Sequence, residues 1–288
     1  MSRLPDFVVI GAMKCATSTL ADQLNRQDGL FMTNPKEPCY FSDDDVYEQG
    51  LSAYSRLFDA ASPGDLLGEA STHYTKLPHL PDTIVRMQDA GLDARFIYVM
   101  RHPTDRLVSH FVHLWARNEV QIPIEEAVEA GLGLVEFGCY AMQVKPYLEA
   151  FGRDRVLPVS YHHMTAHPDD ELRRICAFLG LPGEPAWDHG QEPHNVSAQR
   201  MRTSLLRDAL LNAPVLRTVR KWFPRHLRDR VKGLWQMKQR PELSEATRQR
   251  VESVFDQDLA ELGALLDLDL NCANFKAVTS ERPLDWKE

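Results

Sequence analysis

Short apolar runs recur along the first 180 residues of the chain, and the stretches between them carry apolar residues at helical spacing. An apolar run bounded by turn residues predicts a buried strand. Five runs fit this description: 7–12 (FVVIGA), 29–33 (GLFMT), 65–71 (DLLGEAS), 94–101 (ARFIYVMR) and 155–161 (RVLPVSY). Strands that are apolar on both faces are typical of a parallel sheet covered by helices on both sides.

Helices are predicted between and after these runs, at 17–26, 51–58, 80–91, 103–117, 138–151 and 170–180. Pro103 stands where the fourth helix begins, and the missing N–H of a proline is harmless in a first helical turn. Gly91 and Gly180 close the third and the sixth helix. This alternation predicts an α/β fold with three layers, in which helices flank a central parallel sheet of about five strands.

The pattern changes after residue 180. A last amphipathic helix is predicted by apolar residues at helical spacing, namely Val251, Val254, Phe255, Leu259, Leu262 and Leu266. The chain has 288 residues, 43% of them hydrophobic, which is enough for one large core. We therefore predict a single domain over residues 1–288, with an α/β core over 1–180 and a mainly helical part over 181–288.

Charge and cysteine content exclude several classes of protein. The net charge of -8 argues against a nucleic-acid partner. Five scattered cysteines show no metal-ligand spacing, so neither a metal site nor a disulfide framework is predicted. No run of about 18 apolar residues is present and no apolar run follows the N-terminus, so we expect no membrane span and no signal peptide. Together these features predict a cytoplasmic protein.

Residues 200–240 depart from this acidic balance. They carry many lysines and arginines but only two acids, Asp208 and Asp229. Two interpretations stay open, a solvated helical face and a funnel that attracts an anionic ligand.

The first apolar run ends in a lysine and three hydroxyl side chains, Lys14 followed by Thr17, Ser18 and Thr19. The turn from a parallel strand into a helix presents free backbone N–H groups, and the helix dipole adds positive charge there. A phosphate-like ligand would satisfy these groups together. The spacing is not that of a Walker A loop, in which lysine directly precedes the hydroxyl. The alternative is a plain helix cap beside a lysine in solvent.

This segment, KCATSTL at 14–20, resembles the K-x-G-T-x-x-L signature of sulfotransferases that use 3′-phosphoadenosine-5′-phosphosulfate. The resemblance implies that the 5′-phosphosulfate is bound by Lys14, Cys15, Ala16, Thr17, Ser18 and Thr19. Ala16 departs from the signature, because glycine is usual there. A methyl group at this position is a problem only if the backbone φ is positive.

The segment VMRHPTDRLVSHF at 99–111 is similar to a second motif of that family, R-x-P-x-x-R-x-x-S. By this resemblance Arg101 and Ser109 bind the 3′-phosphate of the nucleotide. Arg106 shares a helix face with Ser109. Two roles for Arg106 stay open, a structural salt bridge with Asp105 or another acid, and a contact with the ligand. Arg200, in HNVSAQR at 194–200, is a candidate for the 3′-phosphate or the adenine side.

The segment KEPCYF at 36–41 resembles the K-E-x-x-(F/Y)-F segment of heparan-sulfate-type sulfotransferases, which implies that Glu37 is the general base. Its alternative is a loop carboxylate paired with Lys36. His73 is the rival base, within a stretch that resembles the E-x-S-P-x-Y segment of the glycan and bacterial type. Lys36 and Tyr140 are candidates to contact the acceptor, although Tyr140 is equally compatible with the core.

The resemblance as a whole implies a sulfotransferase with the P-loop NTPase-like fold of that family. Lys14 would stabilise the leaving phosphate while a sulfuryl group passes to a hydroxyl of a glycan, a glycolipid or a small natural product, releasing 3′-phosphoadenosine-5′-phosphate. No metal is expected. Residues 1–180 would bind the nucleotide and 181–288 would supply the acceptor lid. The alternatives are a P-loop kinase of a small alcohol or nucleoside and a non-catalytic nucleotide-binding protein; the oligomeric state is not predicted.

Overall fold

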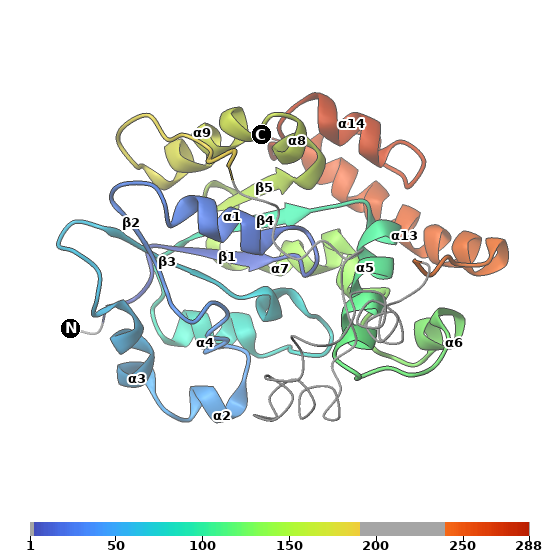
Figure 1. The fold of residues 1–288 in the computed structure, drawn as a ribbon, viewed down its shortest axis with the longest axis horizontal. Helices are drawn as coiled ribbons and strands as arrows, with labels where there is room; N and C mark the ends of the chain where they lie inside the picture. The colour runs from blue at the N-terminus through green and yellow to red at the C-terminus, as the bar shows by residue number, and fades with distance from the viewer. Residues whose placement is uncertain (1–2, 191–239, 288) are drawn as a thin grey trace, which may run out of the picture.

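A five-stranded parallel sheet forms the centre of the molecule in the computed structural model, which describes residues 3–190 and 240–287 (Figure 1). Its strands are β1 Phe7–Gly11, β2 Leu30–Met32, β3 Leu66–Ala70, β4 Arg95–Met100 and β5 Val156–Ser160. Their order across the sheet is β2-β3-β1-β4-β5, and every neighbouring pair runs parallel. The predicted fold class and number of strands are confirmed.

The central strand β1 is buried along its whole length, as expected for a strand apolar on both faces. Phe7 pairs with Gly68 of β3 on one side and with Arg95 of β4 on the other. A side chain at Gly68 would collide with the ring of Phe7, because a Cβ placed there lies 2.1 Å from Phe7 Cζ. Gly68 thus allows the largest side chain of β1 to pack directly over the neighbouring strand.

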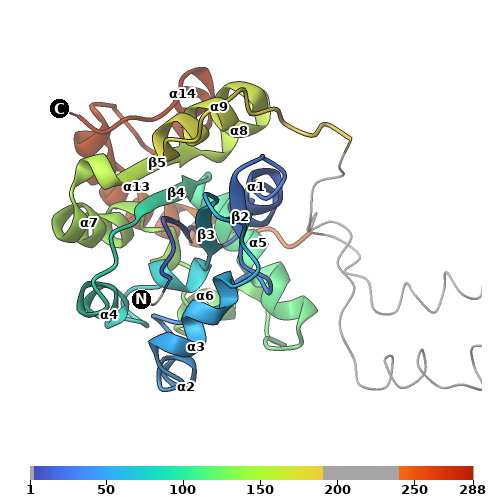
Figure 2. The same ribbon diagram turned by 90° about the vertical axis from the view of Figure 1, so that its left-hand side faces the viewer.

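Helices cover both faces of this sheet. Figure 2 shows α1 on one side of the strands and α4 and α7 on the other. The predicted helices are all present, as α1 Thr17–Leu24, α3 Leu51–Ser55 with the 3-10 turn η1 Arg56–Phe58, α4 Thr83–Asp89, α5 Pro103–Ala116, α7 Tyr140–Phe151, α9 Pro168–Leu179 and α13 Glu245–Leu266. The structure adds short elements that the pattern missed, namely α2 Asp44–Tyr47, the 3-10 turns η2 Thr72–Thr75, η3 Glu136–Gly138 and η4 Arg153–Arg155, α6 Ile124–Glu129, α8 Tyr161–Ala166 and α14 Phe275–Glu281.

The C-terminal helices pack onto the α/β part of the chain. Helix α13 contacts α7 and α5, and α14 contacts α8. The hydroxyl of Ser244 caps α13 by accepting from the backbone N–H of Thr247. The predicted apolar face is buried except at Val254, which is 43% exposed, so its assignment to that face was wrong.

No helix within the described ranges combines the length and the apolar character needed to cross a bilayer. Residues 191–239 of the predicted acceptor lid, which include all of the basic segment 200–240 except Arg240, lie outside the described residues. The division into a nucleotide-binding core and a lid stays a prediction.

Candidate active site

The loop between β1 and α1 lies at the carboxyl edge of the sheet and follows its most buried strand. Two of its residues adopt the left-handed conformation, Lys14 with φ of 72° and Ala16 with φ of 64°. Cys15, which lies between these two residues, is buried, with its thiol 3.8 Å from the hydroxyl of Tyr140. Cys15 therefore anchors the loop in the protein interior, while Lys14 lines a cavity at the carboxyl edge of the sheet.

Ala16 thus occupies the strained backbone conformation that glycine adopts freely. It is the N-cap residue of α1 but offers no side-chain hydrogen bond to the helix. The first turn of α1 contains no acidic residue. The positive end of its dipole is therefore not offset by a carboxylate within that turn, as an anion-binding turn requires.

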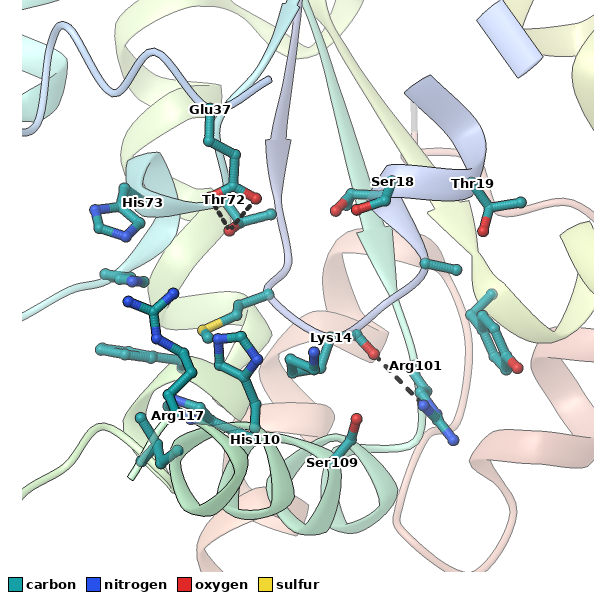
Figure 3. A pocket seen from close by; sticks show the side chains of 18 of the residues that line it. Lys14, Ser18, Thr19, Glu37, Thr72, His73, Arg101, Ser109, His110 and Arg117 are labelled. Atoms are coloured by element: carbon teal, nitrogen blue, oxygen red, sulfur yellow. Dashed lines mark hydrogen bonds between the residues drawn. The ribbon is translucent and has the colours of Figure 1, made fainter. Parts of the chain in front are cut away.

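The hydroxyl residues Thr17, Ser18 and Thr19 begin α1 and line the same cavity as Lys14. In Figure 3, Lys14 and Ser109 lie between two groups of side chains. Ser18, Thr19 and Arg101 lie on one side, and Glu37, Thr72 and His73 lie on the other.

Arg101 follows β4 and comes into contact with the loop after β1. Its Nη1 lies 3.5 Å from the carbonyl oxygen of Lys14, although the two residues are 87 positions apart. Its guanidinium stands over the ring of Tyr161, 4.8 Å from the ring centroid. Its Nε is buried and has no hydrogen-bond partner in the part of the chain that the structure describes. An anionic ligand that accepts from this nitrogen would remove that deficit.

Helix α5 places Ser109 in the same cavity, whereas Arg106 points into the protein interior. Arg106 donates to the carbonyl oxygen of Leu134, and burial lowers the pKa of its guanidinium. The salt bridge considered with Asp105 is not formed, because Asp105 pairs with Lys276 at 2.8 Å. Arg106 is not among the residues that line the cavity.

Tyr140 is fully buried at the start of α7 and does not line the cavity. Its hydroxyl donates to the carbonyl oxygen of Arg101 and also lies 3.3 Å from the backbone nitrogen of Arg101. The structure thus places this residue in the core, the second of the two interpretations given for it. From there it fixes the backbone that carries Arg101.

Glu37 lies in the loop after β2, tied to the end of β3 by a hydrogen bond from its backbone nitrogen to the carbonyl oxygen of Ala70 at 3.0 Å. Its carboxylate accepts from Thr72 and pairs with Lys36 at 2.9 Å. Burial would raise the pKa of this carboxyl, but the Lys36 ammonium outweighs burial, with help from His73 and the Thr72 hydroxyl. The net effect lowers the pKa, so Glu37 is ionised at neutral pH.

His73 is part of η2, which follows β3, and it lies beside Glu37 at the edge of the cavity (Figure 3). Burial and the charge of Lys76 lower its pKa, and the attraction of Glu37 only partly opposes them. The imidazole is therefore neutral at neutral pH. Both candidate bases, Glu37 and His73, are thus in a state that can accept a proton. Lys36, considered as an acceptor contact, is placed in its ion pair with Glu37 and does not line the cavity.

The cavity that these residues share has a volume of about 1340 Å³. It is also lined by cationic and imidazole side chains that the motifs did not identify, namely Lys76, His79, His110, His113 and Arg117. Burial lowers the pKa of His110 to about 2, so its imidazole is neutral. The sequence did carry a signal for part of this lining, because Ser109 and His113 of α5 and its C-cap residue Arg117 follow one another at four-residue spacing. Arg200 lies outside the described residues, whereas Arg240, at the end of the basic segment, lines the cavity.

Residues 4–263 match the sulfotransferase domain family. Heparan sulfate glucosamine 3-O-sulfotransferase 3B1 of Mus musculus is 29% identical over 189 residues, which cover 62% of this chain and 47% of that protein. The chain thus spans about half the length of the curated relatives that it matches first.

Two solved structures share the fold. A sulfotransferase from Alicyclobacillus acidocaldarius superposes with a TM-score of 0.67 at 24% identity, covering 93% of this chain and 98% of that chain. Retinol dehydratase in complex with androsterone and the inactive cofactor PAP superposes with a TM-score of 0.50 at 16% identity, covering 94% of this chain and 84% of that chain.

Proposed function

This chain belongs to the sulfotransferase domain family, and from that premise we propose that it transfers a sulfuryl group from 3′-phosphoadenosine-5′-phosphosulfate to an acceptor hydroxyl. The observation that carries the proposal is the contact between the Lys14 loop and Arg101. The two motifs assigned to the two ends of the nucleotide line one cavity, although they are far apart in sequence.

The residues of this cavity fit an anionic nucleotide. Lys14, the N–H groups of the first turn of α1 and the hydroxyls of Ser18 and Thr19 would hold the 5′-phosphosulfate. Arg101 and Ser109 would hold the 3′-phosphate. The strongest indication of an acceptor there is the buried Nε of Arg101, which finds no hydrogen-bond partner among the described residues.

The donor supplies an activated sulfuryl group with a phosphate as leaving group. In the transfer, the oxygen of the acceptor hydroxyl bonds to sulfur while the bond from sulfur to the 5′-phosphate oxygen breaks. Glu37 takes the proton of the hydroxyl, and its ionised carboxylate is ready to do so. Lys14 stabilises the negative charge that develops on the leaving phosphate, a role that typically lowers a barrier by about 3–4 kcal/mol. The products are a sulfate ester and 3′-phosphoadenosine-5′-phosphate.

The acceptor would enter on the side of Glu37, Thr72 and His73. The name of the mouse relative places its acceptor on a glucosamine of heparan sulfate, which supports a sugar hydroxyl. Lys76, which lines the cavity three residues after His73, supports an acceptor that carries negative charge of its own. The charge of Arg117 is offset by its ion pair with Glu119, which lines the same cavity.

Two measurements test this proposal. Calorimetry should give a Kd for 3′-phosphoadenosine-5′-phosphate at least a hundredfold below the Kd for AMP, because the 3′-phosphate adds contacts to Arg101 and Ser109. Incubation with the ³⁵S-labelled donor should then label a member of a panel of acidic glycans. Equal affinities for the two nucleotides, or tighter binding of ATP with magnesium-dependent turnover, would contradict the proposal and favour a kinase.

A further inference from the structure

The candidate base is one of three neighbouring side chains that can each bind a metal ion. Glu37, Cys39 and His73 each offer one atom that can bind a metal, and these three atoms lie within 4.8 Å of one another. The carboxylate, the thiol and the imidazole come from two segments separated by more than thirty residues, which is why the sequence shows no ligand spacing. The other four cysteines of the chain are buried, whereas Cys39 is half-buried.

Backbone hydrogen bonds position these three residues in the absence of a metal ion. The backbone nitrogen of Glu37 donates to Ala70 at the end of β3, at 3.0 Å. The backbone nitrogen of Cys39 donates to the hydroxyl of Ser71, one residue further, at 3.1 Å. His73 follows two residues later in the same turn. All three ligands are therefore anchored to the same strand end, so small side-chain rotations suffice to bring them together.

The mixture of donor atoms selects a class of cation. Sulfur, imidazole nitrogen and carboxylate oxygen together are typical of Zn²⁺, whereas Mg²⁺ and Ca²⁺ prefer oxygen alone. Tetrahedral zinc with bonds of 2.0–2.3 Å requires ligand atoms about 3.3–3.8 Å apart, which is within reach of the present cluster. Three protein ligands leave a fourth position for water or for the acceptor oxygen.

We propose that Glu37, Cys39 and His73 form a binding site for a thiophilic divalent cation of the Zn²⁺ type, and that the bound cation inhibits the enzyme. Binding replaces the thiol proton of Cys39 by a metal–sulfur bond and releases that proton to solvent. The carboxylate of Glu37 becomes a metal ligand and can no longer accept the proton of an acceptor hydroxyl. This inhibitory effect rests on the proposed function, whereas the binding does not.

Cobalt(II) is the probe for the site, because its thiolate complexes absorb in the near ultraviolet and Zn²⁺ has no such spectrum. The chelator-treated full chain should bind one Co²⁺ with a thiolate-to-metal charge-transfer band, and Zn²⁺ should abolish the band. Cys39→Ser should lose the band, and His73→Asn and Glu37→Gln should each weaken binding at least tenfold. The matched control is Cys176→Ala, a buried cysteine of α9, which should keep the band unchanged.

A missing charge-transfer band, or a band that persists in Cys39→Ser, overturns the site. The inhibition is measured separately with the labelled donor, and the Zn²⁺ concentration for half inhibition should rise at least tenfold in Cys39→Ser. A cobalt complex together with transfer that is insensitive to Zn²⁺ overturns the inhibitory role. A cobalt complex in a chain that does not bind 3′-phosphoadenosine-5′-phosphate overturns the proposed function and leaves the metal site standing.

Discussion

The hydroxyl of Thr72 donates to the carboxylate of Glu37, with Oγ1 3.2 Å from Oε2 and 3.3 Å from Oε1. Lys36 pairs with the same carboxylate at 2.9 Å. The two interpretations of Glu37, a general base and a loop carboxylate paired with Lys36, are thus compatible with each other. The ion pair keeps Glu37 ionised, and the hydrogen bond from Thr72 keeps it at the edge of the cavity.

Glu37→Gln should lower kcat by roughly 100-fold to 10,000-fold, the usual contribution of a positioned base. The amide keeps the size of the side chain but cannot accept a proton. Affinity for 3′-phosphoadenosine-5′-phosphate, measured by calorimetry, should stay within a factor of two, because Glu37 lies across the cavity from Arg101 (Figure 3).

His73→Asn is the comparison that separates the two candidate bases. If Glu37 is the base, this variant should lose less activity than Glu37→Gln at neutral pH. A larger loss in His73→Asn, together with near-normal kcat in Glu37→Gln, would assign the base to His73.

Arg101→Ala should weaken the binding of 3′-phosphoadenosine-5′-phosphate by roughly 10-fold to 100-fold, since a hydrogen bond to a charged group contributes about 1.5–3 kcal/mol. AMP lacks the 3′-phosphate, so its affinity should change by less than a factor of three. Calorimetry with both nucleotides measures this difference. Arg173→Ala, at an exposed arginine of α9, is the control and should leave both affinities unaltered. A parallel loss for the two nucleotides would place Arg101 elsewhere on the ligand.

Ala16→Gly should stabilise the protein by about 0.5–1 kcal/mol. The left-handed conformation costs an L-residue about 1–2 kcal/mol, and the greater freedom of glycine in the unfolded chain takes back part of the gain. Urea denaturation of the two proteins measures the change in the free energy of unfolding.

The same substitution in an ordinary helical position is the control for Ala16. Ala21→Gly, in the middle of α1, should destabilise the protein by about 1 kcal/mol, because glycine disfavours a right-handed helix. Loss of stability in both variants would show that the φ of 64° at Ala16 does not describe the protein in solution.

The sequence predicted the sheet because each strand is an apolar run, and it predicted that Lys14 and Arg101 lie at one edge because both follow parallel strands. The short elements had no such signal. Helix α8 has six residues, too few to show a periodic pattern, yet its Tyr161 carries the contact to Arg101. The position of Tyr140 was undecided for a related reason. An apolar ring fits a core and a pocket equally well, and only the fold shows which one it occupies.

The residues around the candidate base show a second limit. Thr72 and His73 belong to η2 and approach Glu37 from a segment more than thirty residues away, and no local pattern encodes that approach. The position of Ala16 was different, because the resemblance already identified a place where glycine is usual. The sequence thus identified Ala16 as a position where a positive φ would be strained, and the backbone φ of 64° shows that it is positive.

Glu69 of β3 is fully buried below this site. It accepts hydrogen bonds from the hydroxyl of Tyr54 at 2.8 Å and from that of Ser71 at 3.1 Å. Burial raises the pKa of its carboxyl to about 7, although the surrounding hydroxyls oppose the shift. Because Ser71 also accepts from the backbone nitrogen of Cys39, Glu69 supports the loop that carries Glu37.

Glu69→Gln should therefore change how stability depends on pH. In the unfolded chain this carboxyl ionises near pH 4.3, whereas in the folded protein it keeps its proton up to about pH 7. Between these values the native state binds more protons than the unfolded state, so the contribution of Glu69 to stability falls as pH rises, by roughly 4 kcal/mol in all. Glutamine removes this loss. Urea denaturation at pH 5 and at pH 8 should show that the variant gains on the wild type as pH rises, while an equal difference at both pH values would mean that Glu69 ionises normally.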